Sequence, residues 1–228
     1  MTNSIHNVFL EKINKLSDEE EIILAQNISS LLLEIHGVRS SSVNWKQEFT
    51  DEMNLSLFKH GLIKRQGLKD YVLIDLLKLN TFLLKDRSVS RLIKGNSLFN
   101  LVINDDLTLK YEIDEKFGDK IIDLVELNVL AYYRPSLAKK IFDASFEDFN
   151  SKKIYKLFAY YCAKFTIDLI IEKSKINPRQ KELHLEYQEI IDFIFDSYED
   201  FTIYKPKWLE WLFKRVVNQL FFIWSYKK

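Results

Sequence analysis

Hydrophobic residues recur at helical spacing through the first quarter of the chain. Apolar positions within residues 5–16 lie three or four apart and predict a short first helix. Ser17 and Glu20 then have the spacing of a capping box, in which the serine hydroxyl accepts from the glutamate amide while the carboxylate reaches back. A second helix is therefore predicted from Ser17 to about residue 36. A third is predicted from about residue 44 to near residue 61.

The spacing of apolar residues changes in the middle of the chain. Residues 67–84 are strongly apolar and predict another helix, followed by a shorter helix over 88–94. Apolar and polar residues then alternate over 107–113, which is typical of a strand. Residues 101–103 precede the turn sequence Asn104 to Asp106 and predict the partner strand of a β-hairpin.

Helical spacing returns in the second half, and one segment there is apolar over most of its circumference. Helices are predicted over 119–132 and from Pro135, which suits a first helical turn. In residues 152–173, polar side chains four apart form one narrow stripe: Lys156, Tyr160, Lys164 and Asp168. Because apolar residues cover nearly all the rest of this segment, we expect the helix to be surrounded by others.

The pattern as a whole predicts a mainly α fold. We expect a multi-helix globular domain of about eight to ten helices with a small β-hairpin near residues 101–113. Five glycines and three prolines are too few turn residues for a many-stranded sandwich or barrel. Residues 1–228 are predicted to form a single helical domain, with a softer subdivision near residue 115 into 1–114 and 115–228.

Composition excludes several kinds of chemistry. Lys plus Arg and Asp plus Glu are both 33, and a dedicated duplex-DNA or RNA binder usually carries a basic surplus. The chain has neither a P-loop nor a GxGxxG stretch, and the single cysteine, Cys162, offers no disulfide or metal cluster. No metal and no cofactor are expected. No stretch reaches about 18 uncharged apolar residues, so we expect no spanning helix and a cytoplasmic location.

Arg179 and His184 lie five residues apart at the start of an acidic segment, in the sequence Arg-Gln-Lys-Glu-Leu-His. This spacing resembles the Arg-x4-6-His motif of HEPN domains, a family of all-helical proteins that includes many metal-independent ribonucleases. The resemblance implies that His184 takes part in proton transfer and that Arg179 binds the scissile phosphate. It covers six residues, and Glu182 and Glu186 beside it would repel an RNA backbone. The alternative is a solvent-exposed histidine on the polar side of an ordinary helix.

Charge reverses sharply near the C-terminus. Residues 182–200 contain seven acids and no Lys or Arg, whereas residues 203–228 contain six basic residues and a single acid. On a helix over the basic segment, three aromatic side chains fall among the polar residues close to Arg215: Trp208, Trp211 and Phe222. Exposed aromatics beside an arginine are a common binding-surface composition. These four residues are therefore the predicted partner-binding surface.

The leading hypothesis from sequence is a non-catalytic helical module that binds another protein. An accessory subunit, an inhibitor or an immunity-type factor of a bacterial or phage system would each fit. The alternative is a HEPN-like ribonuclease using Arg179 and His184. A weaker alternative is a winged-helix DNA binder with Asn104 to Asp106 at the wing tip, although nucleic acid is not favoured. A homo-oligomer is left open.

Overall fold

The computed structural model describes residues 7–39, 44–63, 68–79, 81–85, 89–93, 98–111, 113–145 and 152–196. These residues are mostly helical, as predicted. The α-helices are α1 (Asn7–Ile13), α2 (Asp18–Gly37), α3 (Trp45–Gly61), α4 (Leu68–Leu79), α5 (Leu127–Tyr133), α6 (Pro135–Ser145), α7 (Lys152–Lys175) and α8 (Lys181–Asp196). The strands are β1 (Ser90–Ile93), β2 (Val102–Ile103), β3 (Leu109–Lys110) and β4 (Ile113–Gly118). Short 3-10 turns follow α4 and flank the strands: η1 (Thr81–Leu84), η3 (Leu98–Asn100) and η4 (Lys120–Leu124).

The predicted capping box begins α2. The Glu20 amide donates to the Ser17 hydroxyl at 3.3 Å, and the Ser17 amide donates to the Glu20 carboxylate at 2.8 Å. The hydrogen bonds to Ser17 hold the pKa of Glu20 below its ordinary value. Acidic residues fill the first turn, where the partial positive charge of the helix N-terminus favours them. The local sequence alone therefore specifies where α2 begins.

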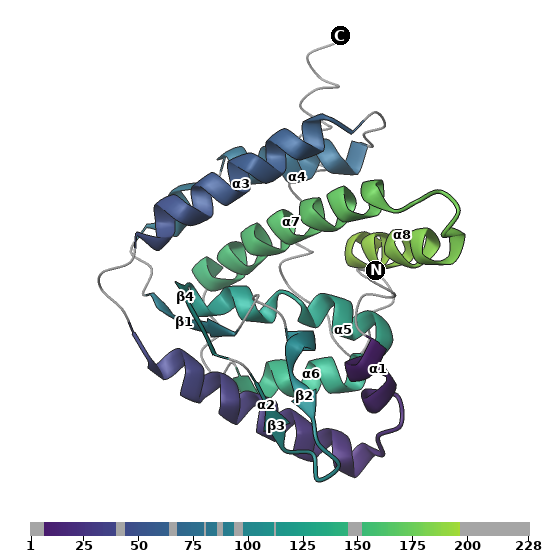
Figure 1. Ribbon diagram of the computed structural model, residues 1–228. Helices are drawn as coiled ribbons and strands as arrows, with labels where there is room; N and C mark the ends of the chain where they lie inside the picture. The colour runs from purple at the N-terminus through teal and green to yellow at the C-terminus, as the bar shows by residue number, and fades with distance from the viewer. Residues whose placement is uncertain are drawn as a thin grey trace.

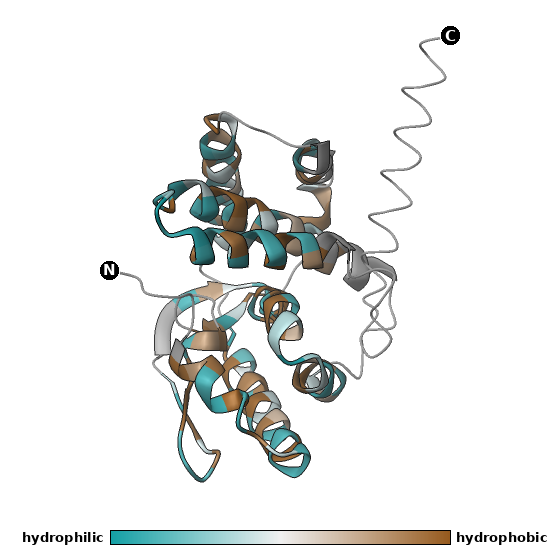
Figure 2. Cartoon of the chain, turned by 90° about the vertical axis from the view of Figure 1, so that its right-hand side faces the viewer, coloured by the Kyte–Doolittle hydropathy of each residue, from teal (hydrophilic) through white to brown (hydrophobic). Residues whose placement is uncertain are grey.

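Helix α7 lies at the centre of the fold, as its apolar circumference predicted. It packs against α3 and α4 on one side and against α8 and η4 on others (Figure 1). Its buried residues include Leu157, Phe158, Tyr160, Tyr161 and Cys162. Figure 2 shows apolar and polar residues alternating along the helices, which is the pattern of amphipathic elements around a shared core.

Two small antiparallel sheets interrupt the helices. The predicted hairpin is present, with Val102 opposite Lys110 and Ile103 opposite Leu109. At its turn Leu107 takes a positive φ of 62° and is nonetheless buried. Its carbonyl accepts a hydrogen bond of 2.9 Å from Asn27 of α2, so the turn is fixed to that helix.

The helix predicted over residues 88–94 is wrong, because Ser90–Ile93 forms β1. This strand pairs antiparallel with β4, with Ser90 opposite Gly118 and Arg91 opposite Phe117. Such a short apolar run has no period of its own, and its partner strand lies farther along the chain. The helix predicted over 67–84 is also interrupted, since α4 ends at Leu79 and a 3-10 turn follows. The single-domain assignment with a boundary near residue 115 stays a prediction.

Candidate ligand pocket

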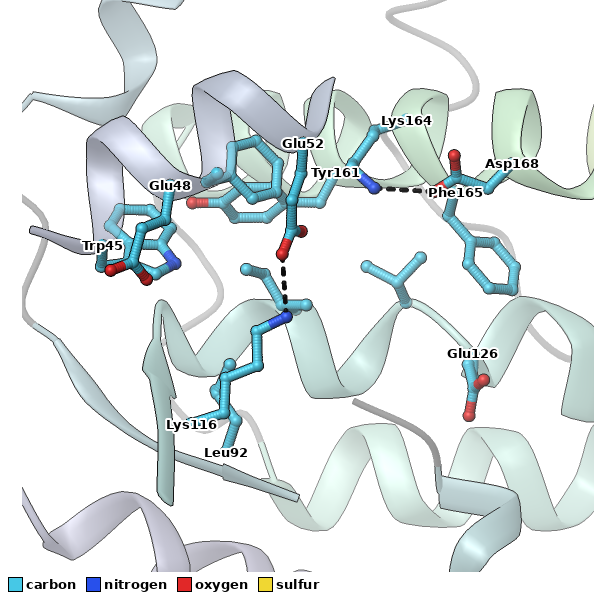
Figure 3. A pocket seen from close by; sticks show the side chains of 13 residues that line it. Trp45, Glu48, Glu52, Leu92, Lys116, Glu126, Tyr161, Lys164, Phe165 and Asp168 are labelled. Carbon is cyan, nitrogen blue, oxygen red and sulfur yellow. Dashed lines mark hydrogen bonds and ion pairs between the residues drawn. The ribbon is translucent and has the colours of Figure 1, made fainter. Parts of the chain in front are cut away.

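A pocket of about 180 Å³ lies between α3, α7 and the strand-and-turn region formed by β1, β4 and η4. Figure 3 shows side chains converging on it from all three sides. Its lining combines aromatic, carboxylate and ammonium groups: Trp45, Glu48, Phe49, Glu52, Leu92, Lys116, Ile122, Val125, Glu126, Tyr161, Lys164, Phe165 and Asp168. Elements far apart in the sequence therefore build one cavity.

Helix α3 supplies an aromatic wall and an acidic edge from a single face. Trp45, Glu48, Phe49 and Glu52 follow the spacing of three and four residues that places side chains on one side of a helix. Trp45 and Phe49 are buried, with ring centroids 5.7 Å apart, whereas Glu48 and Glu52 are exposed. The two carboxylates therefore lie at the mouth of the pocket, above the aromatic rings.

Helix α7 supplies the opposite wall through Tyr161, Lys164, Phe165 and Asp168, again on one helical face. The Lys164 ammonium lies 2.7 Å from the Asp168 carboxylate and 6.0 Å from the centre of the Phe49 ring. Two members of the polar stripe recognised in the sequence thus face the pocket. A third, Tyr160, is fully buried instead, and its hydroxyl donates to the sulfur of Met53 on α3 at 2.9 Å.

Strand β4 closes the third side and approaches α3 closely. The Lys116 ammonium lies 3.1 Å from the Glu52 carboxylate, so an ion pair joins β4 to α3 across the pocket (Figure 3). At the end of β4, a Cβ on Gly118 would fall 2.6 Å from Trp45 Nε1 and 2.7 Å from Leu92 Cδ1. Only glycine leaves room for Trp45 in this position.

Three buried acids on the strand-and-turn side of the pocket hold its parts together. Asp119 accepts from the Tyr161 hydroxyl of α7 at 3.0 Å. Asp123 accepts from the Ile93 amide at the end of β1 at 3.0 Å and lies 2.9 Å from His36 Nε2 of α2. Burial raises the pKa of Asp123, against the lowering effect of these hydrogen bonds.

The third acid, Glu126, accepts from the Leu98 amide at 2.7 Å. Asp123 and Glu126 therefore anchor the chain at Ile93 and again at Leu98, beside the pocket floor. We did not predict these acids as site residues from the sequence. A signal was present, since acids at positions 119, 123 and 126 stand among the apolar residues Ile121, Ile122, Leu124, Val125 and Leu127. Acids within an apolar run are buried only where they find partners, as these three do.

The lining of the pocket has an acidic surplus. Four carboxylates (Glu48, Glu52, Glu126 and Asp168) face two lysines (Lys116 and Lys164), which gives a formal charge of −2. Each lysine is already paired with one of these acids. A pocket with this balance attracts cations and repels phosphates and other anions.

The two predicted site residues that the structure describes do not line this pocket. Arg179 lies in the turn before α8 and His184 in its first turn, and both are exposed. Trp208, Trp211, Arg215 and Phe222 lie outside the described residues. Burial raises the pKa of the Cys162 thiol well above its ordinary value, as expected of an inert core cysteine.

The described part of the acidic segment after Pro178 forms α8, which packs on α7 and α5. Tyr132 of α5 donates to Glu189 at 2.6 Å, and its neighbour Tyr133 donates to Glu186. The hydrogen bond to Glu189 raises the pKa of Tyr132 to about 12. Part of the acidic face is therefore hydrogen-bonded to the fold.

Searches with protein-family models and against curated proteins find no match. Among solved structures, the gentamicin complex of APH(2'')-IIa aligns with a TM-score of 0.51 at 18% identity, over 84% of this chain and 67% of that chain. The ADP-bound aminoglycoside phosphotransferase APH(2'')-Ib aligns with a TM-score of 0.49 at 17% identity, over 86% and 71%. The streptomycin–ATP complex of APH(2'')-IIa gives 0.46 at 18% identity, over 86% and 70%. The fold comparison rests on the first of these.

The fold is thus shared with an enzyme, and the functions predicted from the sequence are wrong. The likeness to a phosphotransferase overturns the non-catalytic protein-binding module, whether accessory subunit, inhibitor or immunity-type factor. It equally overturns the HEPN-like ribonuclease and the winged-helix alternative. The hairpin tip carries Asp105 and Asp106, which would repel DNA, and Asp105 is paired with Lys12 of α1. The Arg179–His184 motif misled because it is short and lies on an exposed surface.

Within the described ranges, none of the helices is both long and apolar enough to cross a membrane.

Proposed function

We propose that this chain is a phosphotransferase-type enzyme whose pocket binds a small, hydroxyl-bearing polycation of the aminoglycoside class. The observation that carries the proposal is the acidic, aromatic lining of the pocket between α3 and α7. The fold likeness to a phosphotransferase solved with gentamicin supports the same ligand class.

Each part of the lining has a role in holding such a ligand. Glu48 and Glu52, one helical turn apart at the mouth, are placed to accept hydrogen bonds from ammonium groups, which form strong charge-assisted contacts with carboxylates. Trp45 lines the same side of the pocket, where its ring offers a cation–π contact. Ser56 donates to Asp168 at 2.6 Å and fixes that carboxylate on the opposite wall.

A phosphotransferase also needs a phosphoryl donor. Across the residues that the structure describes, no three His, Cys, Asp or Glu side chains are grouped so as to hold a metal ion. A nucleotide-bound magnesium ion is held by one or two protein carboxylates together with the phosphates, and we assign no reaction step to it. The proposed reaction class follows from the fold, and the proposed substrate class follows from the pocket.

Calorimetric titration with gentamicin at low salt tests the ligand class. Because each exposed carboxylate contributes up to about 1 kcal/mol, we expect Glu48→Gln with Glu52→Gln to weaken binding by up to about 30-fold. Glu182→Gln, an exposed acid on α8 away from the pocket, is the matched control and should leave affinity unchanged. Equal affinity in the double variant and the wild type would remove the pocket from the proposal.

Mass spectrometry tests the reaction class separately. Incubation of the protein with gentamicin and a nucleoside triphosphate is expected to yield singly phosphorylated gentamicin, and the Glu48/Glu52 double variant should yield less. Tight binding of gentamicin without any phosphorylated product would leave the pocket assignment standing and eliminate the phosphotransferase.

A further inference from the structure

The pocket already contains an ammonium group at its mouth. Lys116 of β4 extends to Glu52 of α3, and the 3.1 Å contact between them crosses the opening (Figure 3). A lysine ammonium has the same charge and the same hydrogen-bonding capacity as a protonated primary amine of a ligand. Lys116 therefore occupies the place on Glu52 that a cationic ligand would take.

This ion pair is easily exchanged. The side chains of Lys116 and Glu52 are 37% and 48% exposed, so water competes with their attraction. Lys116 is a flexible side chain on a strand, with three freely rotating donors and no fixed fork geometry. A ligand amine can therefore displace the Lys116 ammonium into solvent without leaving a buried charge behind.

The second lysine of the pocket is held differently. Lys164 is 16% exposed, and its partner Asp168 also accepts from the Ser56 hydroxyl of α3 at 2.6 Å. Its ammonium is directed over the ring of Phe49. Displacing Lys164 would disrupt a network that joins α3 to α7, so it is part of the wall. Of the two lysines in this pocket, Lys116 is the replaceable one.

We infer that Lys116 is an affinity-determining residue that competes internally with the ligand for Glu52. This inference rests on the proposed function, because it takes the ligand to be cationic. A ligand reaches Oε1 of Glu52, the oxygen that Lys116 contacts, only by displacing that lysine, and every bound cation also meets the positive charge of the Lys116 side chain nearby. Polycations that contact Glu48 as well can offset the free energy lost in displacing Lys116. Lys116 therefore selects against ligands that carry only one or two charges.

Substitutions at position 116 make the inference testable by titration with gentamicin at low salt. Lys116→Met removes the competitor and should tighten binding about 2- to 5-fold, the range expected for one half-exposed ion pair. Lys116→Arg should weaken binding, because a guanidinium pairs with a carboxylate through two parallel hydrogen bonds. Lys175→Met removes one charge from an exposed pair at the end of α7, outside the pocket, and controls for net charge.

A double-mutant cycle separates competition from general electrostatics. If Lys116 acts through Glu52, the gain from Lys116→Met should fall by at least half in a Glu52→Gln background. The inference is overturned if Lys116→Met tightens binding equally in both backgrounds, or if it does not tighten gentamicin binding in a background that binds gentamicin. Either outcome leaves the proposed function intact. Binding by neither the wild type nor Lys116→Met overturns the proposed function itself. Binding seen only after Lys116→Met supports both. Unfolding midpoints of all variants confirm that each is folded.

Discussion

Two carboxylates in this protein are each met by cationic side chains, and they differ in burial. Glu21 at the start of α2 is fully buried and receives hydrogen bonds from Ser136 at 2.9 Å, from Lys140 at 2.6 Å and from Arg134. Glu52 in the pocket is half exposed and has one such partner, Lys116. The first site joins α2 to α6, and the second spans an opening.

This difference in burial separates an ion pair that stabilises the fold from one that a ligand can replace. Burial alone would raise the pKa of Glu21, but the hydrogen bonds from Lys140, Arg134 and Ser136 outweigh it and hold that pKa below its ordinary value. A buried charge deprived of its partners is strongly destabilising, whereas an exposed pair contributes little. Ion pairs in one molecule can therefore be assigned to stability or to ligand exchange by their burial.

The largest expected loss of stability is that caused by Glu21→Ala. Removing this carboxylate leaves Arg134 and Lys140 without their shared partner and opens the contact between α2 and α6. Because both cations are partly exposed, we expect a loss of about 3 kcal/mol in the free energy of unfolding, at the lower end for a buried pair. Urea denaturation measures it. Glu19→Ala, an exposed acid on the same turn, should cost less than about 0.5 kcal/mol. Equal losses in the two variants would show that burial does not distinguish them.

Acid should erase part of that stabilisation. The folded state lowers the pKa of Glu21 below its ordinary 4.5, so its contribution is complete above 4.5 and is lost as the pH falls through the folded value. The difference in unfolding free energy between wild type and Glu21→Gln should therefore be constant at neutral pH and shrink in acid. Denaturation curves recorded from neutral pH down to pH about 3 test this. A difference that grows in acid would reverse the sign of the assigned pKa shift.

A smaller effect is expected beneath the pocket, where two adjacent tyrosines differ in their acceptors. Tyr161→Phe takes a donor from the buried Asp119 and should cost about 1–2 kcal/mol. The Tyr160 hydroxyl donates only to the weak acceptor sulfur of Met53, so Tyr160→Phe should cost about 0.5 kcal/mol or less. Thermal unfolding of the two variants compares them directly. A larger loss for Tyr160→Phe would contradict the ranking.

The smallest effect on stability is expected in the pocket itself. Glu52→Gln breaks the half-exposed pair with Lys116 and should change the free energy of unfolding by less than about 1 kcal/mol. The same variant is expected to weaken cation binding. A loss of stability as large as that of Glu21→Ala would mean that the pocket pair is structural.

Local sequence was sufficient for some of these features. The capping box of Ser17 and the apolar circumference of α7 are set by residues a few positions apart, and both are present as predicted. The polar stripe containing Lys164 and Asp168 was recognised too. Its role could not be, because the facing helix α3 is distant in sequence and its position depends on tertiary packing.

Pairings across long separations were not predictable. In the sequence, Glu21 is one of several acids in the first turn of a helix, and nothing nearby marks it as buried. Its partners Arg134 and Lys140 lie more than a hundred residues away. The sequence predicts a helix at β1 because the four residues of this strand carry no sign of its pairing with β4. The pocket was missed for the same reason, since α3, β4 and α7 contribute to it separately.

The single cysteine has a practical consequence. Cys162 is buried on α7, and its sulfur accepts a hydrogen bond of 3.2 Å from the side-chain amide of Asn128. Burial raises the pKa of the thiol and so keeps it protonated. A thiol reagent can react there only during transient openings of the core. The labelling rate of the unmodified protein therefore measures how often those openings occur. A ligand that bridges α3 and α7 should lower the labelling rate of Cys162 in proportion to its occupancy.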